Sequence, residues 1–286
     1  MSHLLSQAAL FALGINAFEP YIYRLEKDYE EEKFIDWPTI VLSHTVQATA
    51  ISLFKLLPSG SQFDENARKF SARSIFRTFW RLLPFRQKSK EVLDKRSIAS
   101  MIRNIVDTHD VLDMMVNCKS PEEFNLHRDI LGYYIANRIN TVQEHIDKPK
   151  AEQFYKNVQA TYWNKIKKSP LYTQSLERVK KGETVLYKSR RDRVTSVCGD
   201  SSNFVMGILA DISTFVHSIP PTIWMKDIDS LYSDCENNRN IVSIWIKVGN
   251  FYFARVVSIV LEQTNYEVSS EAKRFLDYNK TVFAAS

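Results

Sequence analysis

Long stretches of this sequence carry apolar residues at helical spacing, while glycine occurs only 7 times in 286 residues. Over 97–116 and 203–219, apolar residues recur three and four positions apart, which is the spacing of one face of an α-helix. A parallel α/β enzyme of this length normally uses more glycine in its turns and phosphate-binding loops. The pattern therefore predicts an all-α protein, a single multi-helix bundle domain with about eight to ten helices.

Helix start and stop signals place individual helices. Two N-terminal helices are expected over 4–17 and 18–33, and Trp37-Pro38 is typical of the start of another. Ser120, followed by Pro121 and Glu123, predicts a capped helix that runs to about Ile146. No repeat or clear linker is visible, so we expect one helical domain over 1–286, with an alternative seam near 147–151.

The remaining composition argues for a cytoplasmic protein without a cofactor. Three cysteines, at positions 118, 198 and 235, are far apart and odd in number, which is typical of free thiols. The longest near-apolar run, 37–57, is too polar to span a bilayer, so we expect no membrane contact. No zinc-type spacing, P-loop, GxGxxG or HExxH motif is present, so we expect neither a metal nor a nucleotide cofactor.

Positive charge is unevenly distributed along a chain whose formal net charge is +5. Arg73, Arg77 and Arg81 are spaced four residues apart within an acid-free basic run over 68–90, so they line one helix face. We expect this face to be accessible and not fully paired with acids, which favours phosphate binding, as in RNA recognition. Internal pairing with carboxylates of another helix is the alternative.

Two apolar helices carry polar residues that a plain core helix does not need. On 97–116, Arg103 and Asp107 lie one turn apart and can form an ion pair. They are either a structural clamp or a cation fixed toward an anion. His109 lies near the middle of the apolar arc of the same helix.

On 203–219, Ser213 and His217 lie one turn apart. A serine inside a helix directs its hydroxyl to the carbonyl four residues back, and no glycine elbow is present, so we reject a serine nucleophile. His217 is a candidate general acid or base. Because buried polar groups must find partners, we expect Arg103, Asp107 and His217 to converge.

The segments SIASMIRNIVDTHDVLDMM, SPEEFNLHRDILGYY and NFVMGILADISTFVHSIPP resemble a family of uncharacterised bacterial all-helical proteins. That family pattern has an Arg and an acid one turn apart, then an Arg after a short acidic turn, and late in the chain a Ser shortly before a Val-His pair. The resemblance assigns these positions to Arg103 with Asp107, to Arg128, and to Ser213 with His217.

The chain is also similar to the HEPN superfamily, whose helical domains often carry an Arg and a His four to six residues apart. Arg103 and His109 match that spacing, with an Asn after the Arg. Many HEPN proteins are metal-independent ribonucleases that dimerise. The HEPN resemblance implies catalytic roles for Arg103 and His109. Asp107 and His217 are the further candidate catalytic residues, and Arg128 and Ser213 are candidate anion contacts.

Three functions follow from these patterns. The first is a HEPN-like effector that binds RNA in bacterial antiviral defence or a toxin–antitoxin system. In this hypothesis the protein can also cleave RNA and form a homodimer. The second is a non-catalytic helical module that binds a protein partner or a small anionic ligand. The third is an enzyme that acts on a nucleotide or another phosphorylated small molecule.

Overall fold

The computed structural model describes residues 3–30, 37–57, 93–172, 176–181, 188–216 and 235–284. Within these residues the backbone forms helices and no strand, which confirms the all-α prediction. Nine of the described helices run for nine residues or more, in agreement with the expected eight to ten.

The chain separates into two compact units. The first contains residues 1–109 and 197–286, and the second contains residues 110–196. The seam that we expected near 147–151 therefore falls inside the second unit.

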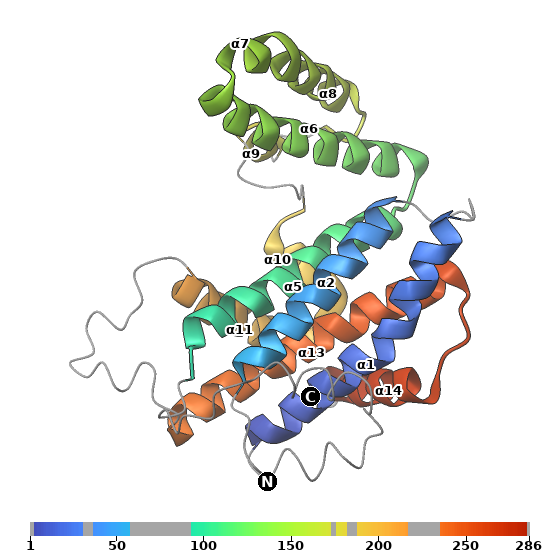
Figure 1. The fold of residues 1–286 in the computed structure, drawn as a ribbon, viewed down its shortest axis with the longest axis vertical. Helices are drawn as coiled ribbons and strands as arrows, with labels where there is room; N and C mark the ends of the chain where they lie inside the picture. Colours follow the sequence, from blue (N-terminus) through green and yellow to red (C-terminus); the bar gives the residue numbers. More distant parts are fainter. Residues whose placement is uncertain are drawn as a thin grey trace, which may run out of the picture. The chain divides into compact units, whose positions relative to one another are not determined.

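The first unit is built around α13 (Glu236–Thr264), a long helix with many buried residues. It packs against α1 (His3–Glu30), α2 (Trp37–Leu56), α11 (Ser202–Val216) and α14 (Ser270–Ala284), and Figure 1 shows α1 and α14 beside it. Phe253 on α13 contacts the rings of Phe11, Phe18 and Phe275. Asn265 ends α13 in the left-handed region, with a φ of 52°, which asparagine tolerates better than most residues.

The first helix differs from the sequence prediction. We expected two helices that meet near residue 17, but α1 continues without interruption through Pro20. A proline inside a helix removes one backbone hydrogen bond and disfavours the helix by about 3 kcal/mol. Phe11 and Phe18, both before the proline, and Ile22 and Leu25 after it are all buried, so packing on both sides of Pro20 stabilises the continuous helix.

One described helix, α13, is long and apolar enough to cross a membrane, with a mean hydropathy of 1.5 over its most apolar window, but 78% of that window is buried inside the protein. Asn250, in the middle of α13, donates from Nδ2 to the backbone carbonyl of Gln7 (3.0 Å) and to its side-chain Oε1 (3.1 Å). Burial of this kind is typical of the core helix of a soluble protein.

The helix α5 (Lys95–Val116) lies in the first unit as far as residue 109, and there its side chains contact α13. Its residue Ile102 lies within 3.5 Å of the position that a β-carbon would take on Gly249. The apolar face of α5 is buried as the sequence pattern predicts, with Ile98, Ile102 and Ile105 fully inside the core. Arg103 and Asp107 occupy another face of the same helix and remain partly exposed.

The second unit is centred on α6 (Pro121–Ile146). Its start is the one predicted: the Ser120 hydroxyl accepts from the Glu123 backbone N–H, and the Glu123 carboxylate accepts from the Lys119 backbone N–H. The short helix α7 (Lys148–Lys150), a π-helical turn η1 (Ala151–Tyr155) and α8 (Lys156–Lys168) fold back along α6. Two further helices, α9 (Leu176–Lys180) and α10 (Arg190–Cys198), complete the unit, and α10 continues into the 3₁₀ turn η2 (Gly199–Ser201) of the first.

The core of the second unit is small and aromatic. Leu126, Ile130 and Tyr133 from α6 pack against Ile166 of α8 and Val179 of α9, with Tyr162, Trp163 and Tyr172 around them. The two helices α6 and α8 approach closely at Gly132. A β-carbon there would lie 2.5 Å from the ring of Tyr162, so only glycine fits.

A buried ion pair joins the C-terminal part of α5 to α10 within the second unit. Arg193 Nε lies 2.6 Å from Asp110 Oδ2, and the Asp110 side chain is only 3% exposed. The same guanidinium donates to the Lys188 backbone carbonyl. The two residues are 83 positions apart in the sequence, so the pair links two segments of this unit that are distant along the chain.

Candidate functional site

Arg103 is held between two partners in the first unit. Its Nε lies 2.7 Å from Asp107 Oδ2 on the same helix, and its Nη1 donates to Ser213 Oγ on α11 at 2.7 Å. The Arg103 side chain is 20% exposed. Part of the guanidinium therefore faces solvent while two of its donors are bonded within the protein.

The Ser213 hydroxyl is fully engaged by structural contacts. It accepts from Arg103 and donates to the Leu209 backbone carbonyl at 2.7 Å, four residues back along α11. That is the bond predicted from its position inside a helix. A hydroxyl held in this way serves as an anchor for the arginine.

His109 lies in the core of the first unit. Its side chain is 0% exposed, and its ring stands edge-on to Tyr252 with the two ring centroids 4.9 Å apart. It occupies the apolar arc of α5, on a different face from Arg103, since six residues along a helix correspond to a rotation of about 120°. The geometry of these residues supports a packing role for His109 and does not bring it to Arg103.

None of the other predicted site residues is placed beside Arg103 by the described part of the structure. Arg128 is exposed on α6 in the second unit. His217 and the basic residues Arg73, Arg77 and Arg81 lie outside the described residues. The structure therefore brings together Arg103, Asp107 and Ser213, whereas the convergence with His217 and the accessibility of the basic face stay predictions.

A second polar cluster, which the sequence reasoning missed, lies at the N-terminal ends of α5 and α13 in the first unit. Lys95 Nζ donates to Asn238 Oδ1 at 2.7 Å and lies 5.5 Å from the ring centroid of Phe215. Trp245 Nε1 donates to Asp211 Oδ2 at 2.8 Å. Burial lowers the pKa of the Lys95 ammonium below its ordinary value, and the nearby Cys235 and Asp211 oppose that change. No local spacing links these residues, so only the tertiary structure identifies the cluster.

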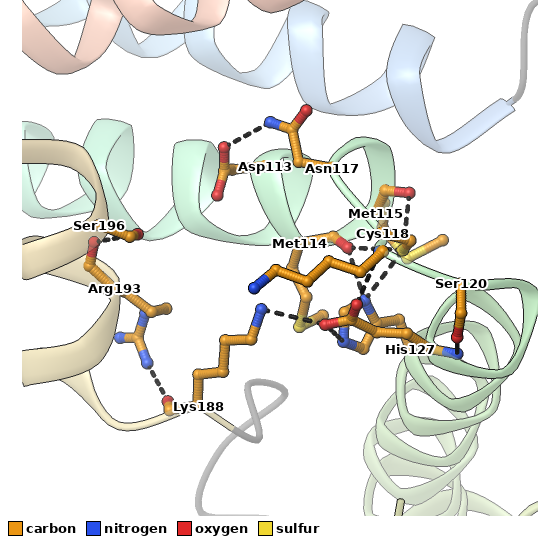
Figure 2. A network of polar contacts seen from close by, with 12 residues as sticks. Asp113, Met114, Met115, Asn117, Cys118, Ser120, His127, Lys188, Arg193 and Ser196 are labelled. Carbon is orange, nitrogen blue, oxygen red and sulfur yellow. Dashed lines mark hydrogen bonds and ion pairs between the residues drawn. The ribbon is translucent and has the colours of Figure 1, made fainter.

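A third cluster lies in the second unit, where α5 ends and α6 begins. Figure 2 shows His127 beneath the last residues of α5, close to Met114 and Cys118. His127 Nδ1 lies 2.5 Å from the Met114 carbonyl oxygen and 3.4 Å from Cys118 Sγ. Glu123 is 3.8 Å from His127 Nε2, and Lys188 Nζ pairs with Glu123 at 3.0 Å.

The chemistry of this third cluster is that of a structural contact. Burial raises the pKa of the Cys118 thiol, and the Glu123 carboxylate raises it further. Burial lowers the pKa of His127. A nucleophilic cysteine needs a thiolate beside an imidazolium, and both of these shifts favour the uncharged forms.

No metal centre is visible in the part of the chain that the structure describes. No group of three or more His, Cys, Asp or Glu side chains there is arranged to hold a metal ion.

The most unusual surface feature is an exposed apolar row along α6, which we call the outer α6 stripe. Its members are 37% to 72% exposed: Phe124, Ile135, Ile139, Val142 and Ile146. At 100° per residue these five positions lie within an arc of roughly 60°, opposite the face that packs on α8. The sequence predicts the α6 helix but does not identify the stripe. Apolar residues occur on two faces of this helix, and their spacing alone does not reveal which face is buried.

Comparison of the chain with family models, curated proteins and solved structures finds no match. The resemblances to an uncharacterised bacterial family and to the HEPN superfamily stay predictions.

Proposed function

We propose that this protein is a helical binding module that docks a protein partner on the outer α6 stripe. The observation that carries the proposal is the row of five exposed apolar side chains along one face of a well-capped helix. Single exposed apolar residues are common on soluble proteins, whereas several exposed apolar side chains on one helix face are typical of an interaction surface.

The shape of the stripe supports a helical partner. Its two ends, Phe124 and Ile146, lie six helical turns apart, about 33 Å at 1.5 Å per residue. It is also narrow: the steps of four, three and four residues from Ile135 to Ile146 match the seam of a coiled coil. A surface that inserts into lipid normally carries a wider apolar face.

The proposal places the protein in the cytoplasm. Its three cysteines, all within the described residues, are thiols and not disulfides, as is usual in a reducing compartment.

Site-specific photo-crosslinking tests the proposal. A photoreactive amino acid at Val142 should crosslink the protein to one discrete partner in its native host. The same amino acid at Asn164, which is exposed on α8, is the matched control and should give no such product. Ile135→Glu should remove the Val142 crosslink while preserving the helical circular dichroism spectrum. Crosslinking at Asn164 equal to that at Val142 would contradict the proposal.

RNA binding is the second candidate, and the charge distribution favours it. Residues 110–196, which form the second unit, contain sixteen Lys and Arg against eleven Asp and Glu, so their excess of five equals the net charge of the whole chain. In this hypothesis, phosphates contact the basic surface, and the affinity for RNA falls steeply with salt because counterions are released. The partly exposed Arg103 would then contact a scissile phosphate.

A gel-shift assay and a cleavage assay, both with metal chelated, test this candidate. Replacing Arg73, Arg77 and Arg81 with Gln should weaken RNA binding and flatten its salt dependence. Arg103→Ala should abolish cleavage with binding retained. If the wild-type protein binds no RNA at low salt, the nucleic-acid function is rejected.

A further inference from the structure

The outer α6 stripe carries cations and no acid. Arg128 lies within its arc, between Phe124 and Ile135, and Arg138 lies roughly 70° from its centre at 100° per residue. Both arginines are exposed. The Arg138 guanidinium stands 5.1 Å from the centre of the Tyr134 ring, on the same helix.

The acids of α6 lie on the far side of the helix. Glu122, Glu123, Asp129 and Glu144 are all rotated by more than roughly 100° from the centre of the stripe. Two of them have cation partners: Glu123 pairs with Lys188 at 3.0 Å, and Glu144 pairs with Lys156 at 3.6 Å. No carboxylate of α6 is therefore placed to neutralise Arg128 when a partner covers the stripe.

From this arrangement we infer that the partner is an amphipathic helix with an apolar seam and acidic flanks, and that one of its carboxylates pairs with Arg128. This inference rests on the proposed function. A cation covered by a partner without a compensating acid is costly, whereas an arginine–carboxylate pair is favourable and specific. The basic second unit attracts such an acidic helix before contact is made.

A second copy of this chain fits the stripe less well. Parallel, in-register pairing of two α6 helices brings both copies of Arg128 together, and in neither direction does the stripe face of the other copy supply an acid. Charges of one sign on a coiled-coil seam oppose pairing. A partner of different sequence, with acids where this helix has arginines, avoids that repulsion.

Two synthetic helical peptides of about three heptads test the inference. Both peptides have the same Leu/Ile seam. The positions that flank the seam are Glu in the first peptide and Lys in the second. Fluorescence anisotropy with the full chain should show binding of the Glu peptide, at least tenfold tighter than binding of the Lys peptide. Arg128→Glu should reverse this preference, and Val142→Glu should weaken binding of the Glu peptide by about tenfold or more, which corresponds to about 1.4 kcal/mol.

Arg191→Glu is the matched control, because it makes the same change in charge at an exposed position of another helix, α10. It should leave the preference between the two peptides unchanged. Helical circular dichroism and sedimentation velocity of every variant check that the fold and the oligomeric state of the wild-type protein are retained.

The remaining outcomes overturn the inference in distinguishable ways. Equal binding of both peptides shows an apolar surface without charge selection. If neither peptide binds while the Val142 crosslink is present, the proposed function stands and the acidic helix is wrong. A dimer that Val142→Glu dissociates identifies a second copy as the occupant. Binding to vesicles of anionic phospholipid that Val142→Glu abolishes, without peptide binding, identifies a membrane surface.

Discussion

Arg103 on α5 and Ser213 on α11, 110 residues apart in sequence, are joined by a hydrogen bond of 2.7 Å between Nη1 and Oγ. The bond crosses from one helix to another, while the Arg103–Asp107 ion pair remains within α5. Together these contacts tie the polar face of α5 to α11 and set the direction of the guanidinium.

The first prediction concerns this bond. Ser213→Ala should lower the free energy of unfolding of the first unit by about 1 kcal/mol, the usual contribution of a hydrogen bond. Thr214→Ala is the control, because the Thr214 hydroxyl makes the same kind of local bond, to the Ala210 carbonyl, at an exposed position, whereas the Arg103 bond goes to Ser213. Chemical denaturation measures both variants. Equal losses would show that the Arg103 bond contributes nothing beyond the local one.

The second prediction uses two glycines inside helices. Gly132→Ala should destabilise the second unit by about 1–3 kcal/mol, because the new β-carbon would lie 2.5 Å from the Tyr162 ring. Gly207→Ala on α11 meets no atom within 4 Å and should stabilise the helix by about 1 kcal/mol through helix propensity. Thermal melts monitored by circular dichroism compare the two. A gain in stability for both variants would show that α6 and α8 separate easily at Gly132.

The third prediction is a loss of stability of the second unit in mild acid. Burial lowers the pKa of His127 from its ordinary value of 6.5, so the unfolded chain takes up a proton there before the folded chain does. The stabilisation is complete above pH 6.5, and it is lost progressively as the pH falls from 6.5 toward the lower folded pKa. Hydrogen exchange of α6 amides, corrected for the intrinsic pH dependence of exchange, should report a lower opening free energy at pH 5.5 than at pH 7.5.

The control for that prediction is another histidine of the same helix. His127→Gln should flatten the dependence of the opening free energy on pH. His145→Gln, at an exposed position near the end of α6, should leave it in place. If His127→Gln retains the full dependence on pH, another group is responsible for it.

The fourth prediction concerns the buried pair of Asp110 and Arg193. Asp110→Ala should cost about 3 kcal/mol, because it leaves a largely buried guanidinium without its carboxylate. The double replacement Asp110→Leu with Arg193→Met should recover most of that loss. Asp113→Ala serves as the control, since the Asp113 carboxylate accepts an exposed hydrogen bond from the Asn117 amide on the same turn of chain. Equal costs for the Asp110 and Asp113 replacements would contradict a special role for the pair.

Local features of the chain were predictable because their causes lie within one or two helical turns. The Ser120 cap, the Arg103–Asp107 pair and the bond from Ser213 to the Leu209 carbonyl all join residues at most four positions apart. Their geometry follows from the helix itself. The sequence by itself therefore determined the all-α class, the start of α6 and the partners that these side chains find on their own helix.

Only the tertiary structure decided which helix faces are covered. Burial of His109 against Tyr252 and continuation of α1 through Pro20 depend on packing between helices distant in sequence. The same holds for Gly132, whose role is set by the Tyr162 ring. On α6, apolar residues lie on two faces, so the sequence does not show which face is buried. In the fold one face packs against α8, and the face that runs from Ile135 to Ile146 is exposed to solvent. The spacing of apolar residues shows which side chains share one face of a helix. Which other helix covers that face depends on the tertiary fold.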